Sequence, residues 1–65
     1  MMRFHYELLS YGVYRLHMTT YSPTHSKEYV TPIIMGFRND AEEEIKFLYS
    51  LSIKERFELH DWKEI

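Results

Sequence analysis

Two segments of the chain, residues 2–9 and 13–21, alternate between apolar and polar side chains. A period of two places every second side chain on the same side of a strand, so this alternation predicts two strands with one buried face each. The buried face of the first strand carries Phe4, Tyr6 and Leu8, and that of the second carries Tyr14, Leu16 and Met18.

The segment between the two strands, Ser10-Tyr11-Gly12, predicts a hairpin loop. Glycine has no Cβ and adopts the left-handed conformation that such a loop needs. A three-residue loop pairs Leu8 with Tyr14 and joins the two apolar faces. A two-residue turn would shift the register by one and bring Leu8 opposite Arg15. The loop and the alternation agree only for the three-residue loop.

A third strand is expected from about Glu28 to Phe37, after a loop over residues 22–27. Pairing Tyr21 with Glu28 sets its register against the second strand. Pro32 has no N–H group, so this strand should lie at an edge of the sheet or be bulged there. The residues expected on its core face are Tyr29, Ile33, Met35 and Phe37.

A helix is predicted to begin at Asn39 or Asp40 and to end at Ser52. Asp40 and Glu43 have the spacing of a capping box, and Glu42 and Lys46 have the spacing of an i,i+4 ion pair. The apolar stripe at helical spacing consists of Ala41, Ile45, Leu48 and Leu51, with Phe47 at its margin.

The last residues of the chain allow two interpretations. Phe57 and Leu59 alternate with polar residues, which favours a fourth strand, while Ser52 and Glu55 have the spacing of a helix cap. The strand is the favoured interpretation. It would run parallel to the first strand and lie beside it, in the order 4-1-2-3 with a right-handed crossover. The expected fold is α+β, a β-β-β-α-β chain of three or four mainly antiparallel strands with one helix on one face.

The length of 65 residues allows a single domain, residues 1–65. The chain has no cysteine, which excludes disulfides and thiolate metal sites and fits a reducing compartment. Arg3 places a charge too early for the apolar region of a signal peptide, and no apolar run approaches the roughly 20 residues of a membrane helix. We therefore expect a cytoplasmic protein without a membrane partner.

The net charge of −2 disfavours a general nucleic-acid binder, which needs a basic surplus. Residues 1–37 have three basic and two acidic side chains, and residues 38–65 have five basic and eight acidic. A nucleic-acid-binding regulator that uses Arg3, Arg15 and His17 on the sheet face opposite the helix remains the alternative function.

The arrangement of histidines and serines predicts neither an enzyme nor a cofactor. His5 and His17 should face each other beside Glu7, but no close-spaced set of ligands supports a metal site. No serine has a recognisable adjacent base, and two glycines do not make a phosphate loop. We predict no catalytic, metal-binding or cofactor-binding residues.

An apolar strip of Val30, Pro32 and Ile34 is predicted on the sheet face that the helix leaves open. Such patches often mark interaction surfaces. Cover by Trp62 and Ile65 of the C-terminal segment is the alternative. The predicted partner-binding residues are Tyr21, Tyr29, Val30, Ile34, Arg15 and His17.

The function expected from these features is that of a non-catalytic protein-binding module, whose partner is a larger protein or a second copy of the chain. The specific expectation is an inhibitor of a larger host enzyme. It would be encoded by a phage or mobile element, act in the host cytoplasm, and belong to the anti-CRISPR or anti-restriction class.

Overall fold

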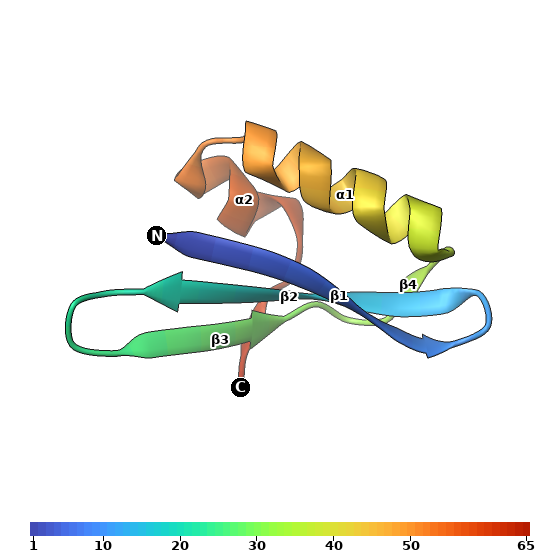
Figure 1. Cartoon of the computed structure of the whole chain (residues 1–65), viewed down its shortest axis with the longest axis horizontal. Helices are drawn as coiled ribbons and strands as arrows, with labels where there is room; N and C mark the ends of the chain where they lie inside the picture. The colour runs from blue at the N-terminus through green and yellow to red at the C-terminus, as the bar shows by residue number, and fades with distance from the viewer.

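The computed structural model describes all 65 residues as one antiparallel sheet with two helices on the same face (Figure 1). The elements are β1 (Met2–Ser10), β2 (Val13–Tyr21), β3 (Ser26–Val30), β4 (Ile34–Met35), α1 (Arg38–Ser50), α2 (Ile53–Leu59) and β5 (Lys63–Glu64). The strand order is β1-β2-β3-β5, and β4 pairs with β2. The predicted α+β class is confirmed, whereas the structure has two helices instead of one.

The hairpin of β1 and β2 confirms the predicted register. Leu8 pairs with Tyr14, Glu7 with Arg15 and His5 with His17. Gly12 has φ +81°, the left-handed conformation expected of it. The predicted three-residue loop Ser10-Tyr11-Gly12 was wrong, because Ser10 pairs with Val13 after an irregularity in β1 and leaves a two-residue turn, Tyr11-Gly12. The irregularity absorbs the one-residue shift, so the apolar faces stay together.

The third predicted strand is broken into β3 and β4, and its predicted register was wrong. Tyr21 pairs with Ser26 instead of Glu28, and Tyr14 pairs with Ile34. One extra residue enters between the two strands, around Pro32, as the predicted bulge requires. The other prediction for Pro32, an edge strand, does not hold for β3, because β5 pairs with its outer side.

At this break, the side chain of Thr31 supplies a hydrogen bond that the sheet backbone does not. The backbone N–H of Thr31 donates to Leu16 O, and the Thr31 hydroxyl accepts from the backbone N–H of Leu16 at 3.0 Å. Thr31 is almost fully buried, so an unpaired group here would be costly. The hydroxyl replaces the carbonyl that a continuous strand would have provided.

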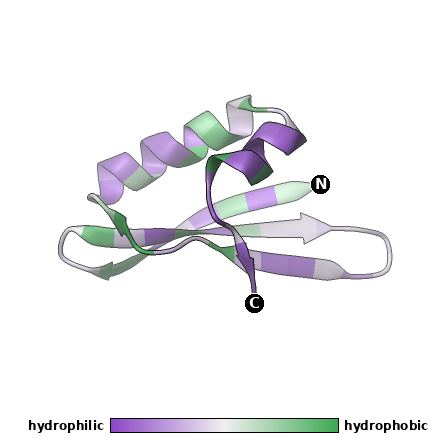
Figure 2. Ribbon diagram, turned by 180° about the vertical axis from the view of Figure 1, so that it is seen from behind, coloured by the Kyte–Doolittle hydropathy of each residue, from purple (hydrophilic) through white to green (hydrophobic).

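The extra residue reverses which side chains of this segment face the helices. Ile34 packs against the core, so its predicted place on the open face was wrong. The predicted core positions Ile33, Met35 and Phe37 are exposed, Met35 at 80%. Tyr29 lies before the break and packs against the core as predicted. In Figure 2, the hydrophobic β4 contrasts with the hydrophilic β5.

The helix α1 begins at Arg38, one residue before the earlier of the two predicted positions. Asp40 accepts from the backbone N–H of Phe37 at 2.8 Å, so the predicted capping pair of Asp40 with Glu43 was wrong. Lys46 lies nearer to Glu43 than to its predicted partner, Glu42. The predicted apolar stripe is confirmed. The buried core comprises Phe4, Tyr14, Leu16, Met18, Ala41 and Leu48, and Ile45 and Leu51 pack against it.

The favoured interpretation of the tail, a fourth strand beside β1, was wrong. Residues 53–59 form α2, and the order 4-1-2-3 is replaced by β5 pairing antiparallel with β3. The capping box of Ser52 and Glu55, the alternative in the sequence, decides the outcome: the Ser52 hydroxyl accepts from Glu55 N–H and the Glu55 carboxylate accepts from Ser52 N–H. Each bond satisfies a backbone N–H group that a helix start leaves free.

Candidate binding hollow

The largest hollow of the molecule, about 410 Å³, lies between the β2–β3 hairpin and α2. The hairpin extends past both helices (Figure 1). This volume falls in the lower part of the range of roughly 300–1,000 Å³ typical of ligand pockets. We call it the hairpin hollow, and its lining residues are Met1, Met2, Thr20, Tyr21, Ser22, His25, Lys27, Tyr29, Ile53 and Phe57.

One wall of the hairpin hollow is the face of α2 that carries Ile53 and Phe57. These residues are four apart, so they lie on successive turns of one face. The ring of Phe57 meets that of Tyr29 edge to face, with 5.7 Å between the centroids. Ile53 is 62% exposed and Phe57 40% exposed. The wall is therefore apolar, and much of its surface is accessible to solvent.

Arg56 attaches this wall to the rest of the fold. Its Nε donates to Leu48 O at 2.8 Å and a terminal nitrogen donates to Tyr49 O at 3.1 Å. These carbonyls lie in the last turn of α1, where a helix leaves acceptors free and favours a positive charge. The guanidinium also lies 5.5 Å from the centroid of the Phe4 ring. Arg56 therefore helps to set the orientation of α2, together with the contact between Phe57 and Tyr29.

The loop at the rim of the hairpin hollow closes on itself through Ser22 and His25. The Ser22 backbone N–H and hydroxyl both donate to His25 O, at 2.9 and 2.7 Å, and His25 N–H donates to the Ser22 oxygen at 3.2 Å. The rim is therefore held in one conformation by its own hydrogen bonds. A loop already held in one conformation loses less entropy on binding.

The lining of the hairpin hollow contains basic residues and no acidic one. Lys27 and His25 are among the ten lining residues, and none of the ten is acidic. No carboxylate lies within 4.0 Å of the ammonium group of Lys27 or of Lys54, which follows Ile53 on α2. The hairpin hollow thus combines an apolar interior with uncompensated positive charge.

The open face of the sheet carries a polar network centred on Glu7 instead of a continuous apolar strip. One oxygen of Glu7 accepts from Arg15 Nε at 2.9 Å and lies 2.8 Å from His17 Nε2, and the ring of His17 stacks on that of His5. The hydrogen bonds from Arg15 and then His17 lower the pKa of Glu7. Of the three side chains expected to contact nucleic acid, only Arg3 has no carboxylate partner.

No group of three or more histidine, aspartate or glutamate side chains is arranged to hold a metal ion. None of the helices has the length and apolar character that crossing a membrane requires.

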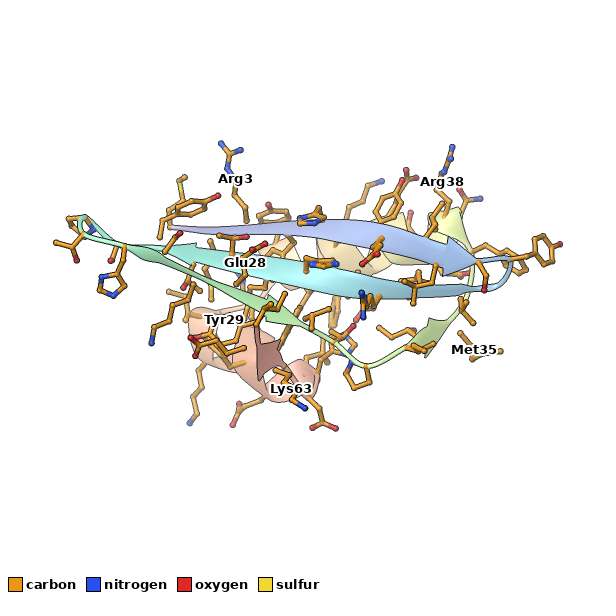
Figure 3. All side chains as sticks on the ribbon, turned by 90° about the horizontal axis from the view of Figure 1, so that it is seen from below. Arg3, Glu28, Tyr29, Met35, Arg38 and Lys63 are labelled. Carbon is orange, nitrogen blue, oxygen red and sulfur yellow. The ribbon has the colours of Figure 1, made fainter.

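The six predicted partner-binding residues separate into three places. Tyr21 and Tyr29 line the hairpin hollow. Arg15, His17 and Val30 lie on the open face, where Val30 pairs with His17. Ile34 belongs to the core side. Figure 3, seen from the open face, shows Tyr29 beside the part of the sheet behind which α2 passes.

Ile53 and Phe57 are the site residues that sequence reasoning missed. The cap of Ser52 and Glu55 was the available signal, because a helix starting there places both side chains on one face. Their position opposite Tyr21 depends on how α2 packs, which no local pattern encodes.

No protein family, curated protein or solved structure matches this chain.

Proposed function

We propose that this domain is a non-catalytic protein-binding module and that the hairpin hollow receives a side chain of its partner. The observation that carries the proposal is the incomplete cover of apolar side chains around the hairpin hollow. Tyr21, Ile53 and Phe57 are 44%, 62% and 40% exposed while lining one concave surface. Concave apolar surfaces with a few polar groups are where proteins bind ligands and the anchor residues of partners.

The small core makes this exposure significant. Six apolar residues are buried, and a domain of 65 residues buries only about 60% of the surface of its unfolded chain. Burying Ile53 and Phe57 would add stability, at about 25 cal/mol per Å² of apolar area. Leaving them accessible is explained if a second molecule covers them.

The specific form of this proposal is inhibition of a larger enzyme in the cytoplasm. A module that only binds acts on its partner by covering part of it. An enzyme is the proposed target because the chain is small and its sequence has no recognisable catalytic motif. Once a partner is identified, its activity with and without this protein tests that form.

Site-specific photo-cross-linking in cells that naturally produce the protein tests the proposal. A photoreactive phenylalanine analogue replaces Tyr21, at the mouth of the hairpin hollow, or Lys46, an exposed residue of α1. We expect one discrete cross-linked product from position 21 and none from position 46. Adding Ile53→Asp to the chain labelled at position 21 should remove the product.

Ile53→Asp is suited to this test because it should leave α2 intact. Residue 53 is the first residue of α2, where the helix dipole favours a negative charge. Equal products from both positions, or a product that persists with Ile53→Asp, would place the binding surface elsewhere.

A further inference from the structure

We infer that the hairpin hollow binds an acidic segment of a partner protein, whose aromatic side chain enters the hollow while its flanking carboxylates pair with Lys27 and Lys54. This inference rests on the proposed function and specifies the chemistry of the partner. It follows from the distribution of charge around the two apolar depressions that border α2.

The lining of the hairpin hollow includes the cation Lys27 and no carboxylate. The chain has more acidic than basic residues, ten against eight. Arg15 and Lys46 each lie within 4.0 Å of a carboxylate, whereas the other six lysine and arginine side chains do not. Lys27 and Lys54 are among these six. Carboxylates of another molecule can therefore pair with Lys27 without displacing an ion pair within the chain, and complementary charge steers association and selects the partner.

The groove on the other side of α2 has the opposite character. It lies between the two helices and is lined by Phe47, Leu51, Glu55, Glu58 and Leu59. Its apolar floor resembles that of the hairpin hollow, but its charged groups are both carboxylates. An acidic segment would be repelled from this groove, so the protein contains its own control surface.

The interior of the hairpin hollow suits an aromatic ring. Tyr21, Tyr29 and Phe57 present rings from three different elements, and the edge-to-face contact of Tyr29 with Phe57 shows how rings pack there. Aromatic pairs favour such tilted contacts, and an aromatic anchor has few torsions to immobilise. An aliphatic anchor would fill the space without these contacts.

Selection of peptides from a random displayed library tests the inference. The library is selected on wild-type protein, on Lys27→Glu and on Lys46→Glu, which makes the same change of charge on exposed α1. Wild type and Lys46→Glu should enrich peptides with an aromatic residue flanked by aspartate or glutamate. Lys27→Glu should lose those peptides, and their affinity for wild type should fall as salt concentration rises.

Two variants locate the selected peptides on the surface. Ile53→Asp should weaken binding of the enriched acidic peptide by about tenfold or more, as truncation of a central contact does. Phe47→Asp, in the groove between the helices, should leave the affinity unchanged.

Three other results would overturn the inference, and they differ in what they leave of the proposed function. Enriched peptides that are basic or lack an aromatic residue, yet require Ile53, would refute the acidic segment and leave the proposed function intact. Peptides that bind Ile53→Asp as tightly as wild type would refute both. Self-association of the protein that Ile53→Asp abolishes would make a second copy the occupant, and the acidic partner would again be excluded.

Discussion

The helix-facing side of the sheet has two halves that share strands but differ in cover. Under α1, the β2 residues Tyr14, Leu16 and Met18 are fully or almost fully buried. Farther along the same strand, Thr20 and Tyr21 border the hairpin hollow. The cover by α1 stops there, and the apolar side chains Ile53 and Phe57 of α2 line the space beside the sheet. One half therefore holds the fold together, and the other half leaves apolar side chains of α2 exposed.

This difference follows from the reach of the elements. The hairpin of β2 and β3 extends beyond the end of α1, and only the seven-residue α2 stands beside it (Figure 1). A short helix with no buried residue of its own provides a wall but cannot close the space. Substitutions in the covered half should change stability, and those in the open half should change binding.

The largest loss of stability is expected for Leu16→Ala, in the centre of the covered half. Leu16 is fully buried, so its truncation leaves a cavity and should cost about 2–5 kcal/mol. Urea unfolding followed by circular dichroism measures the change. The same truncation at the partly exposed Leu59 should cost less than about 1 kcal/mol. Equal losses would mean that burial does not separate the two positions.

Gly36→Ala should destabilise the covered half at its border with α1. An added Cβ would lie 2.8 Å from a ring carbon of Tyr14 and 3.1 Å from Asp40, and φ there is +153°. The combined clash and strain should cost roughly 1–3 kcal/mol. Gly12→Ala has the strain of φ +81° but no clash, since its Cβ would lie 3.9 Å from the Phe37 ring, so it should cost about 1 kcal/mol. A larger loss at Gly12 in thermal melts would contradict this ranking.

Ser52→Ala tests whether the two halves unfold separately, because Ser52 caps α2, the helix that forms one wall of the hairpin hollow. Loss of an N-cap hydroxyl costs about 1 kcal/mol. Hydrogen exchange should show faster exchange of the α2 amides, while the amides of β1 and β2 keep their protection. Uniformly faster exchange would instead show that α2 and the sheet unfold together.

Acidification should lower the free energy of unfolding by a smaller amount, through protonation of Glu7 on the open face. The pKa of Glu7 in the folded protein lies below its ordinary value of 4.5, because Arg15 and then His17 hydrogen-bond its carboxylate. The pair therefore stabilises the fold above pH 4.5, and this stabilisation is lost as pH falls through the lowered pKa. The difference in unfolding free energy between wild type and Glu7→Gln should shrink over that interval. A difference that is constant with pH would contradict the pairing.

The sequence was sufficient where short-range pattern and burial agree. The register of β1 with β2 and the apolar stripe of α1 were predicted because each is encoded within a few residues. The predicted facing of the third strand was wrong after Pro32. The bulge there is stabilised by the hydrogen bond from Leu16 N–H to the Thr31 hydroxyl, a contact between residues fifteen apart. That single inserted residue exchanged the places of Ile34 and Met35.

The prediction for the C-terminal segment was wrong for a different reason. Phe57 and Leu59 fit a strand by alternation, while Ser52 and Glu55 fit a helix by capping, and the packing of Arg56 on the end of α1 supports the helix. The prediction of Tyr21 and Tyr29 as partner-binding residues remains a prediction. The structure places both in a hollow that depends on α2.

The most direct test of the account is the cross-linking yield from position 21 in the Ile53→Asp protein, compared with the same label in otherwise wild-type protein. The proposed function predicts a loss of about tenfold or more at an unchanged urea midpoint, because Ile53 contacts the partner and not the core. An unchanged yield would contradict the account, since binding would then not involve the hairpin hollow. A midpoint lowered as far as that of Leu16→Ala would contradict it as well, because Ile53 would then belong to the covered half.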